Sequence, residues 1–294
     1  MISPEYLDEW AEHVPWVDND QIEKDLIVSK AMLDIYSQPK LRENYPMRGG
    51  TAFNKLHRAT PARFSEDIDM VQLKGERIGE TLGVIRSALD PWLGEADWDR
   101  GERGHKLLYH YKTTATPDAP SEDATLKVEI NTREHDSLYG TVTRPFSLSS
   151  PLGSGKVEIP TYTVDELMGT KLRALYQRRK GRDLFDLGLV LDEGTVDPER
   201  LVKAFNHYMI NEGGPVGREQ FHANFIDKIK QEEFGKDITR VVDPNITFEI
   251  ASHARNVIGE LINRLPHEQE LKEQHKQSQS PVQADKSSIR GFAD

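Results

Sequence analysis

A glycine pair followed by a strand-like acidic segment constrains the fold of this 294-residue chain more than any other feature. Gly49-Gly50-Thr51 precedes a short helix-like run at residues 52–57, and the segment RFSEDIDM follows at residues 63–70. Side chains alternate across a strand, so Asp67 and Asp69 share one face while the apolar residues beside them turn toward a core. The sequence therefore predicts a strand that presents two carboxylates next to a glycine turn.

This pattern favours a site for a hard cation and a phosphate. Carboxylates held close together repel unless a cation lies between them, and Mg2+ accepts one or two carboxylates alongside phosphate oxygens. The segment LKVEIN adds a third acid, with apolar neighbours facing the opposite way, and this would complete a two-metal site. Glycines allow close approach to a ligand, and the amides that begin the next helix favour a phosphate. The expected metal ligands are Asp67, Asp69 and Glu129, and the expected phosphate contacts are Gly49, Gly50 and Thr51.

The composition limits the other classes of protein. The chain has no cysteine, which excludes disulfides, thiolate zinc sites and a cysteine nucleophile. Its formal charge of -11 argues against nonspecific coating of nucleic acid, which relies on a positive surface. The sequence contains no stretch of about 20 apolar residues and no apolar signal region at its start, so we expect a cytoplasmic protein with no membrane partner.

The chain divides into a part with strands and a part made of helices. Apolar spacing predicts helices from about residue 22 to residue 38 and at 76–89, and a hairpin-like pair of strands at 105–113 and 124–131. From Val164 onward, helical patterns cover residues 164–177, 182–191, 198–209, 219–230 and 248–265. We predict an α+β fold with a sheet domain at 1–163, a helical domain at 164–266 and a disordered polar tail at 267–294.

These motifs resemble those of a known family. Gly49-Gly50-Thr51 with SEDID at residues 65–69 is similar to the first motif of the AbiEii toxins, which belong to the DNA polymerase β-like nucleotidyltransferases. KVEIN resembles their acidic second strand, and residues 164–187 resemble their later motifs, in which a lysine precedes an Arg-Asp pair. The resemblance implies that Lys171 is a phosphate-binding or catalytic lysine and that Asp183 is an active-site carboxylate. The superfamily commonly has Gly-Ser where this chain has Gly50-Thr51.

Several residues keep two interpretations. Lys171 alone would be taken for a solvated lysine on an amphipathic helix. The basic residues at 173–182 either suit the end of a helix dipole or hold a triphosphate or an RNA backbone, and on the second interpretation Arg178 and Arg182 bind the nucleotide. Ser65 beside the acids is a further predicted nucleotide contact and, in principle, a site of inactivating phosphorylation. Asp186 is either structural or a support for the site.

The resemblance implies a toxin of a toxin–antitoxin or abortive infection system, with a separately encoded antitoxin as partner. The implied reaction is Mg2+-dependent transfer of a nucleotide from a nucleoside triphosphate to an acceptor, with the 3′ end of a tRNA as the implied acceptor and growth arrest as the result. Two alternatives stay open, because paired acids also serve kinases and nucleases, and because the same fold can act as an inactive nucleotide-binding module.

Overall fold

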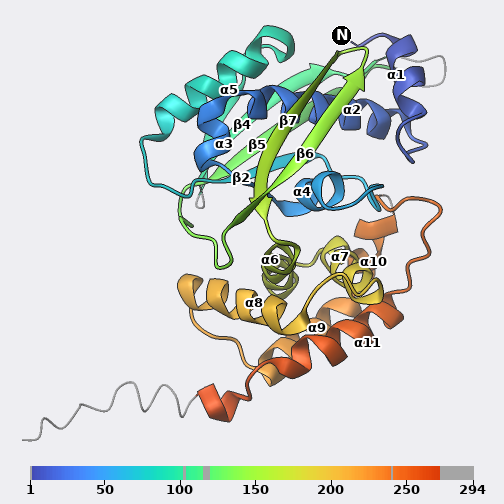
Figure 1. The fold of residues 1–294 in the computed structure, drawn as a ribbon. Helices are drawn as coiled ribbons and strands as arrows, with labels where there is room; N and C mark the ends of the chain where they lie inside the picture. The colour runs from blue at the N-terminus through green and yellow to red at the C-terminus, as the bar shows by residue number, and fades with distance from the viewer. Residues whose placement is uncertain (1, 102–103, 115–119, 240, 272–294) are drawn as a thin grey trace, which may run out of the picture.

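The computed structural model describes residues 2–101, 104–114, 120–239 and 241–271, and it has the predicted α+β architecture. A seven-stranded mixed sheet lies with helices α1 to α5 in one half of the molecule, and helices α6 to α11 form the other half (Figure 1). The strand order is β3-β4-β5-β2-β1-β7-β6. The strand that carries the predicted acids is therefore in the middle of the sheet.

The central strands confirm the predicted sheet. β2 (Asp67–Val71) pairs with β5 (Asp123–Asn131) in parallel and with the short β1 (Met47–Arg48) in antiparallel orientation. β5 also forms the predicted antiparallel pair with β4 (Gly104–Lys112). The remaining strands are β3 (Asp97–Gly101), β6 (Thr141–Ser150) and β7 (Gly153–Tyr162). These three were not predicted, because β3 is polar and exposed and the outer parts of the β6–β7 hairpin lack a clear apolar alternation.

Among the described residues, five helices accompany the sheet in the first half of the molecule. They are α1 (Pro4–Ala11), α2 (Asn19–Ser37), α3 (Pro39–Asn44), α4 (Gly49–Leu56) and α5 (Ile78–Leu93). α2 is buried along most of its length and packs across the sheet, so the first helices form a structural flank of the sheet. α4 begins at the glycine pair itself and lies between the sheet and α6 (Figure 1).

The second half is helical, as predicted. Its elements are α6 (Val164–Gln177), α7 (Gly181–Asp192), α8 (Pro198–Glu212), α9 (Arg218–Ile229), α10 (Glu232–Thr239), α11 (Ile250–Glu260) and the 3-10 turn η1 (Ile262–Arg264). The Thr163 side chain caps α6 and Asp197 caps α8, which fixes where these helices begin. Only α10 was missed, because two turns carry too little periodicity to stand out.

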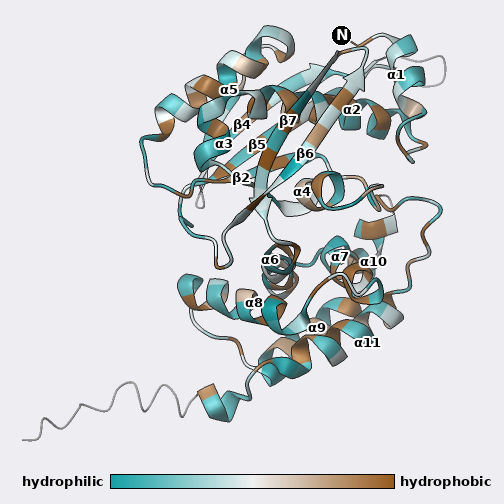
Figure 2. Ribbon diagram, in the orientation of Figure 1, coloured by the Kyte–Doolittle hydropathy of each residue, from teal (hydrophilic) through white to brown (hydrophobic). Residues whose placement is uncertain are grey.

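The described residues form two large apolar cores, one in each half, and a small third cluster of Ala62, Phe185 and Ile238. Hydrophobic residues recur along the strands and the helices of both halves (Figure 2). Phe53, Val71 and Tyr162 come from the sheet half but belong to the helical core, so the two halves share packing. Within the described residues, no helix is both long and apolar enough to cross a membrane. The domain boundaries stay a prediction, and most of the predicted tail, residues 272–294, lies outside the described residues.

Candidate active site

The predicted acids meet on one face of the central strands. Asp69 pairs in register with Glu129, and Asp67 pairs with Lys127. The intervening Ile68 is fully buried, as the alternation predicts. The three carboxylates therefore line one partly exposed face of β2 and β5, opposite the face that carries Ile68; this is the acidic face.

The negative charges of the three carboxylates on this face are only partly neutralised by neighbouring cations. Burial and the nearby Asp67 raise the pKa of Asp69 above its ordinary value. Lys127 Nζ lies 2.9 Å from Asp67 and 3.4 Å from Glu129, so one ammonium already supplies part of the counter-charge. The sequence analysis missed Lys127, although its position two residues before Glu129 puts it on the same strand face.

At each position of the glycine pair, a different neighbour leaves no room for a side chain. Gly49 has a φ of 80°, and a Cβ there would lie 2.3 Å from the Asp69 carboxylate. A Cβ on Gly50 would lie 2.3 Å from the guanidinium of Arg63. Thr51 is buried; its hydroxyl donates to the Asp67 carbonyl and is hydrogen-bonded to Ser65 at 2.8 Å. The two glycines thus allow the Asp69 carboxylate and the buried Arg63 guanidinium to pack closely against the start of α4.

A chain of alternating charges, buried except at Arg178, connects the segment between α4 and β2 to the helical half. Arg63 binds Asp186 through two hydrogen bonds of 2.7 Å, and Lys171 lies 3.0 Å from Asp186 and 3.1 Å from Asp183. Arg178 completes the chain with hydrogen bonds of 2.7 and 2.8 Å to Asp183. Lys171 is therefore buried, and the solvated interpretation of it is wrong. Asp186 thus links Arg63 of the sheet half to Lys171 of the helical half.

The pKa values of Asp183 and Arg178 are shifted in the directions that their ion pair favours. Burial opposes ionisation of Asp183, but Lys171 and Arg178 outweigh it and hold the pKa well below its usual range. The hydrogen bond with Asp183, and more weakly the charge of Asp69, raise the pKa of Arg178. Arg178 is half-exposed, so its guanidinium lies at the rim of the site and lies near enough to Asp69 to sense its charge.

The other predicted arginine lies next to the acidic strand. Arg182 is 3.8 Å from Glu66, the residue before Asp67, and 3.8 Å from Asp237 on α10. All the predicted site residues thus surround the start of α4 and the face of β2. Their individual roles remain predictions.

A second charged link adjoins the site and was not predicted. Glu134 accepts hydrogen bonds of 2.6 Å from Arg48, the residue before the glycine pair, and from Arg173 on α6. Burial opposes its ionisation, but the two arginines lower the pKa of Glu134 to about 2. No local sequence pattern indicates this contact, because the partners are 86 and 39 residues from Glu134.

The donor set suits a magnesium ion shared with a nucleotide. Among the described residues, no group of three or more His, Asp or Glu side chains is arranged to hold a metal. Mg2+ needs only one or two carboxylates when phosphate oxygens complete its shell. Asp67 and Asp69 provide two hard oxygen ligands whose mutual repulsion a cation would relieve. Lys127 lies 2.9 Å from Asp67 and 3.4 Å from Glu129, so a cation bound by either acid would compete with this ammonium.

Comparisons with known proteins agree with this geometry. The sequence model of the family described as "Nucleotidyl transferase AbiEii toxin, Type IV TA system" matches residues 30–253. The fold is similar to that of MenT4, a nucleotidyltransferase toxin from Mycobacterium tuberculosis H37Rv, with a TM-score of 0.64, 16% identity and coverage of 95% of this chain and 97% of that one. It is also similar to JHP933 from Helicobacter pylori, with a TM-score of 0.51, 17% identity and coverage of 90% and 98%. A comparison with curated proteins gives no match.

Proposed function

This chain belongs to the AbiEii family of nucleotidyltransferase toxins of type IV toxin–antitoxin systems, and we propose that it transfers a nucleotide from a nucleoside triphosphate to the 3′ end of a tRNA in a Mg2+-dependent reaction. The observation that supports this most directly is the seating of Asp69. Its carboxylate is held beside Asp67 and against Gly49, with a raised pKa that a cation would reverse.

In the proposed reaction, different residues bind the triphosphate, hold the metal ion and position the arginine. The triphosphate lies at the first amides of α4, which are positive at the helix start, and Arg178 at the rim neutralises charge as it develops. Mg2+, when held by Asp67 and Asp69, supplies charge that binds the triphosphate and lowers the pKa of the acceptor hydroxyl. Lys171 and Asp183 hold Arg178 in place through the buried chain.

The bond changes follow from these positions. The acceptor hydroxyl oxygen bonds to the α-phosphorus, the bond from that phosphorus to the bridging oxygen breaks, and pyrophosphate leaves. The hydroxyl proton passes to Glu129, which is partly exposed on the acidic face, whereas Asp183 is fully engaged by cations and is a poor proton acceptor. Nucleotides added to the 3′ end of tRNA would block its charging and arrest growth. The reaction takes place in the cytoplasm, where a cognate antitoxin restrains it.

The test is incubation of the purified protein with Mg2+, total tRNA and each α-labelled nucleoside triphosphate in turn. We expect label in RNA with the unchanged protein and none with Asp69→Ala, whose thermal stability should not fall, because the change removes a repelled carboxylate. Asp99→Ala, an acid on the exposed strand β3, is the matched control and should transfer normally.

Other outcomes would contradict the proposal. Label in protein instead of RNA would rule out the tRNA acceptor. Transfer that persists without divalent cation, or in Asp69→Ala, would rule out the proposed role of the acidic face.

A further inference from the structure

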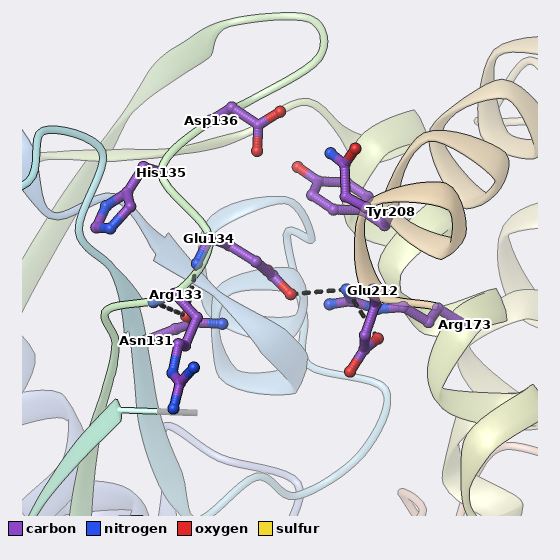
Figure 3. Close-up of a pocket in the computed structure, with 9 residues that line it drawn as sticks. Asn131, Arg133, Glu134, His135, Asp136, Arg173, Tyr208 and Glu212 are labelled. Atoms are coloured by element: carbon purple, nitrogen blue, oxygen red, sulfur yellow. Dashed lines mark hydrogen bonds and ion pairs between the residues drawn. The ribbon is translucent and has the colours of Figure 1, made fainter. Parts of the chain in front are cut away.

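A large polar pocket lies between the sheet and the helical half, beside the proposed active site (Figure 3). Its volume is about 870 Å3, within the range of small-molecule sites. One wall is the segment that follows β5 and the other is formed by α6 and α8. Its lining includes Asn131, Glu134, Asp136, Arg173, Tyr208 and Glu212.

The pocket is one step along the sheet from the acidic face. Asn131 follows Glu129 by two positions on β5, so both side chains share a face and lie about 7 Å apart along the strand. Arg48 joins the two regions, because its backbone pairs with Asp69 while its guanidinium binds Glu134 in the pocket wall. A ribose occupies a comparable interval between the α-phosphate of a nucleotide and its base.

The charges of the pocket disfavour a phosphate. Arg173 is already bound by Glu134 at 2.6 Å and lies 3.4 Å from Glu212. Asp136 adds a further carboxylate, bound to His207 at 2.6 Å. The lining holds three carboxylates, those of Glu134, Asp136 and Glu212, against the two guanidinium groups of Arg133 and Arg173, so a polyanion meets net repulsion here. An uncharged ligand with hydrogen-bonding groups fits better.

Asn131 provides a hydrogen-bond donor for such a ligand. It is only 3% exposed, and its Oδ1 accepts hydrogen bonds of 2.8 and 3.0 Å from the backbone N–H groups of Arg133 and Glu134. These bonds fix the orientation of the amide. Its Nδ2 has no hydrogen-bond partner among the described residues, although Asn131 lines the pocket. This donor is open to the pocket, so an acceptor atom of a ligand there can take its hydrogen bond.

We propose that this pocket holds the base and ribose of the incoming nucleoside triphosphate, with Asn131 Nδ2 donating to an acceptor atom of the base. This rests on the proposed function, because it takes the triphosphate to lie at the start of α4. The pocket then determines which nucleotide is transferred, while the phosphates are bound at the acidic face. The Tyr208 ring, with Arg173 above it at 5.1 Å, forms the inner wall.

The experiment compares ligands with and without a nucleoside. Binding of ATP, CTP, GTP, UTP and inorganic tripolyphosphate is measured by calorimetry in the presence of Mg2+. Asn131→Asp keeps the Oδ1 acceptor and replaces the Nδ2 donor by an acceptor. We expect it to weaken binding of the preferred nucleotide about tenfold or more and to leave tripolyphosphate binding unchanged. Tripolyphosphate also serves as the control for added charge, since it would sense a long-range effect most strongly.

A second variant guards against loss of folding. Asn211→Leu places a larger side chain at the exposed rim of the pocket on α8, and it should weaken nucleotide binding without affecting tripolyphosphate. The inference is overturned if both variants bind all four nucleotides like the unchanged protein. It is also overturned if Asn131→Asp raises only the KM for tRNA, which would assign the pocket to the acceptor. If the unchanged protein binds neither nucleotides nor tripolyphosphate, the proposed function itself fails.

Discussion

Asp186→Asn tests whether the buried charge chain holds the two halves of the molecule together. Asp186 is fully buried and accepts two hydrogen bonds of 2.7 Å from Arg63, whose side chain is only 2% exposed. Lys171 approaches the same carboxylate at 3.0 Å. The amide has almost the same shape as the carboxylate, but it has one oxygen in place of two, so it cannot keep all three contacts, and it carries no charge to balance the two cations.

The size of the expected loss of stability follows from the contacts that Arg63 would keep in the variant. Arg63 would keep a hydrogen bond of 2.9 Å to the Phe64 carbonyl, but its charge would be buried without an acid. Removing one partner of a buried ion pair destabilises a protein by about 3–5 kcal/mol. For a chain of this size, about 2 °C is expected per kcal/mol, so the melting temperature should fall by roughly 6–10 °C.

Urea unfolding followed by circular dichroism measures the change. Asp123→Asn is the matched control, because Asp123 makes an ion pair of the same 2.7 Å length with Lys112 but is 85% exposed. Exposed pairs contribute between zero and about 1 kcal/mol, so the control should unfold like the unchanged protein. If Asp186→Asn were within about 1 kcal/mol of the unchanged protein, the charge of Arg63 would not depend on this carboxylate, and the reasoning would be refuted.

Three further predictions concern the site and its surroundings. Gly49→Ala should lower nucleotide transfer at least tenfold, because its Cβ would displace the Asp69 carboxylate; Gly194→Ala, also at positive φ (62°) but with open space around it, should lose only about 1 kcal/mol of stability and no activity. Burial and the nearby arginine lower the pKa of His57 to about 4, so the unfolded chain binds a proton first and stability falls as the pH drops from 6.5 toward 4. Denaturant titrations at both pH values should show a smaller fall in His57→Gln, and an equal fall would contradict the assignment. Lys127→Met removes a cation 2.9 Å from an acidic ligand, so the Mg2+ concentration for half-maximal transfer should drop several-fold; an increase would mean that the lysine serves catalysis directly.

Features that depend on neighbouring residues could be predicted from the sequence. The alternation around Asp67 and Asp69 put both acids on one strand face, since side chains in a strand must alternate. Helical spacing predicted α6 at the positions where it occurs, and the parallel placement of Glu129 beside Asp69 confirmed the expected neighbouring strand. These predictions succeeded because periodicity is a local property of the backbone.

Only the tertiary structure decided how the charges are balanced. Arg63 meets Asp186 across 123 positions of sequence, and Arg48 meets Glu134 across 86. The pocket beside Asn131 likewise exists only because the segment after β5 lies opposite α6 and α8. Buried ion pairs and cavities arise from the packing of distant elements, and no periodic pattern in the chain encodes which cation will face which acid.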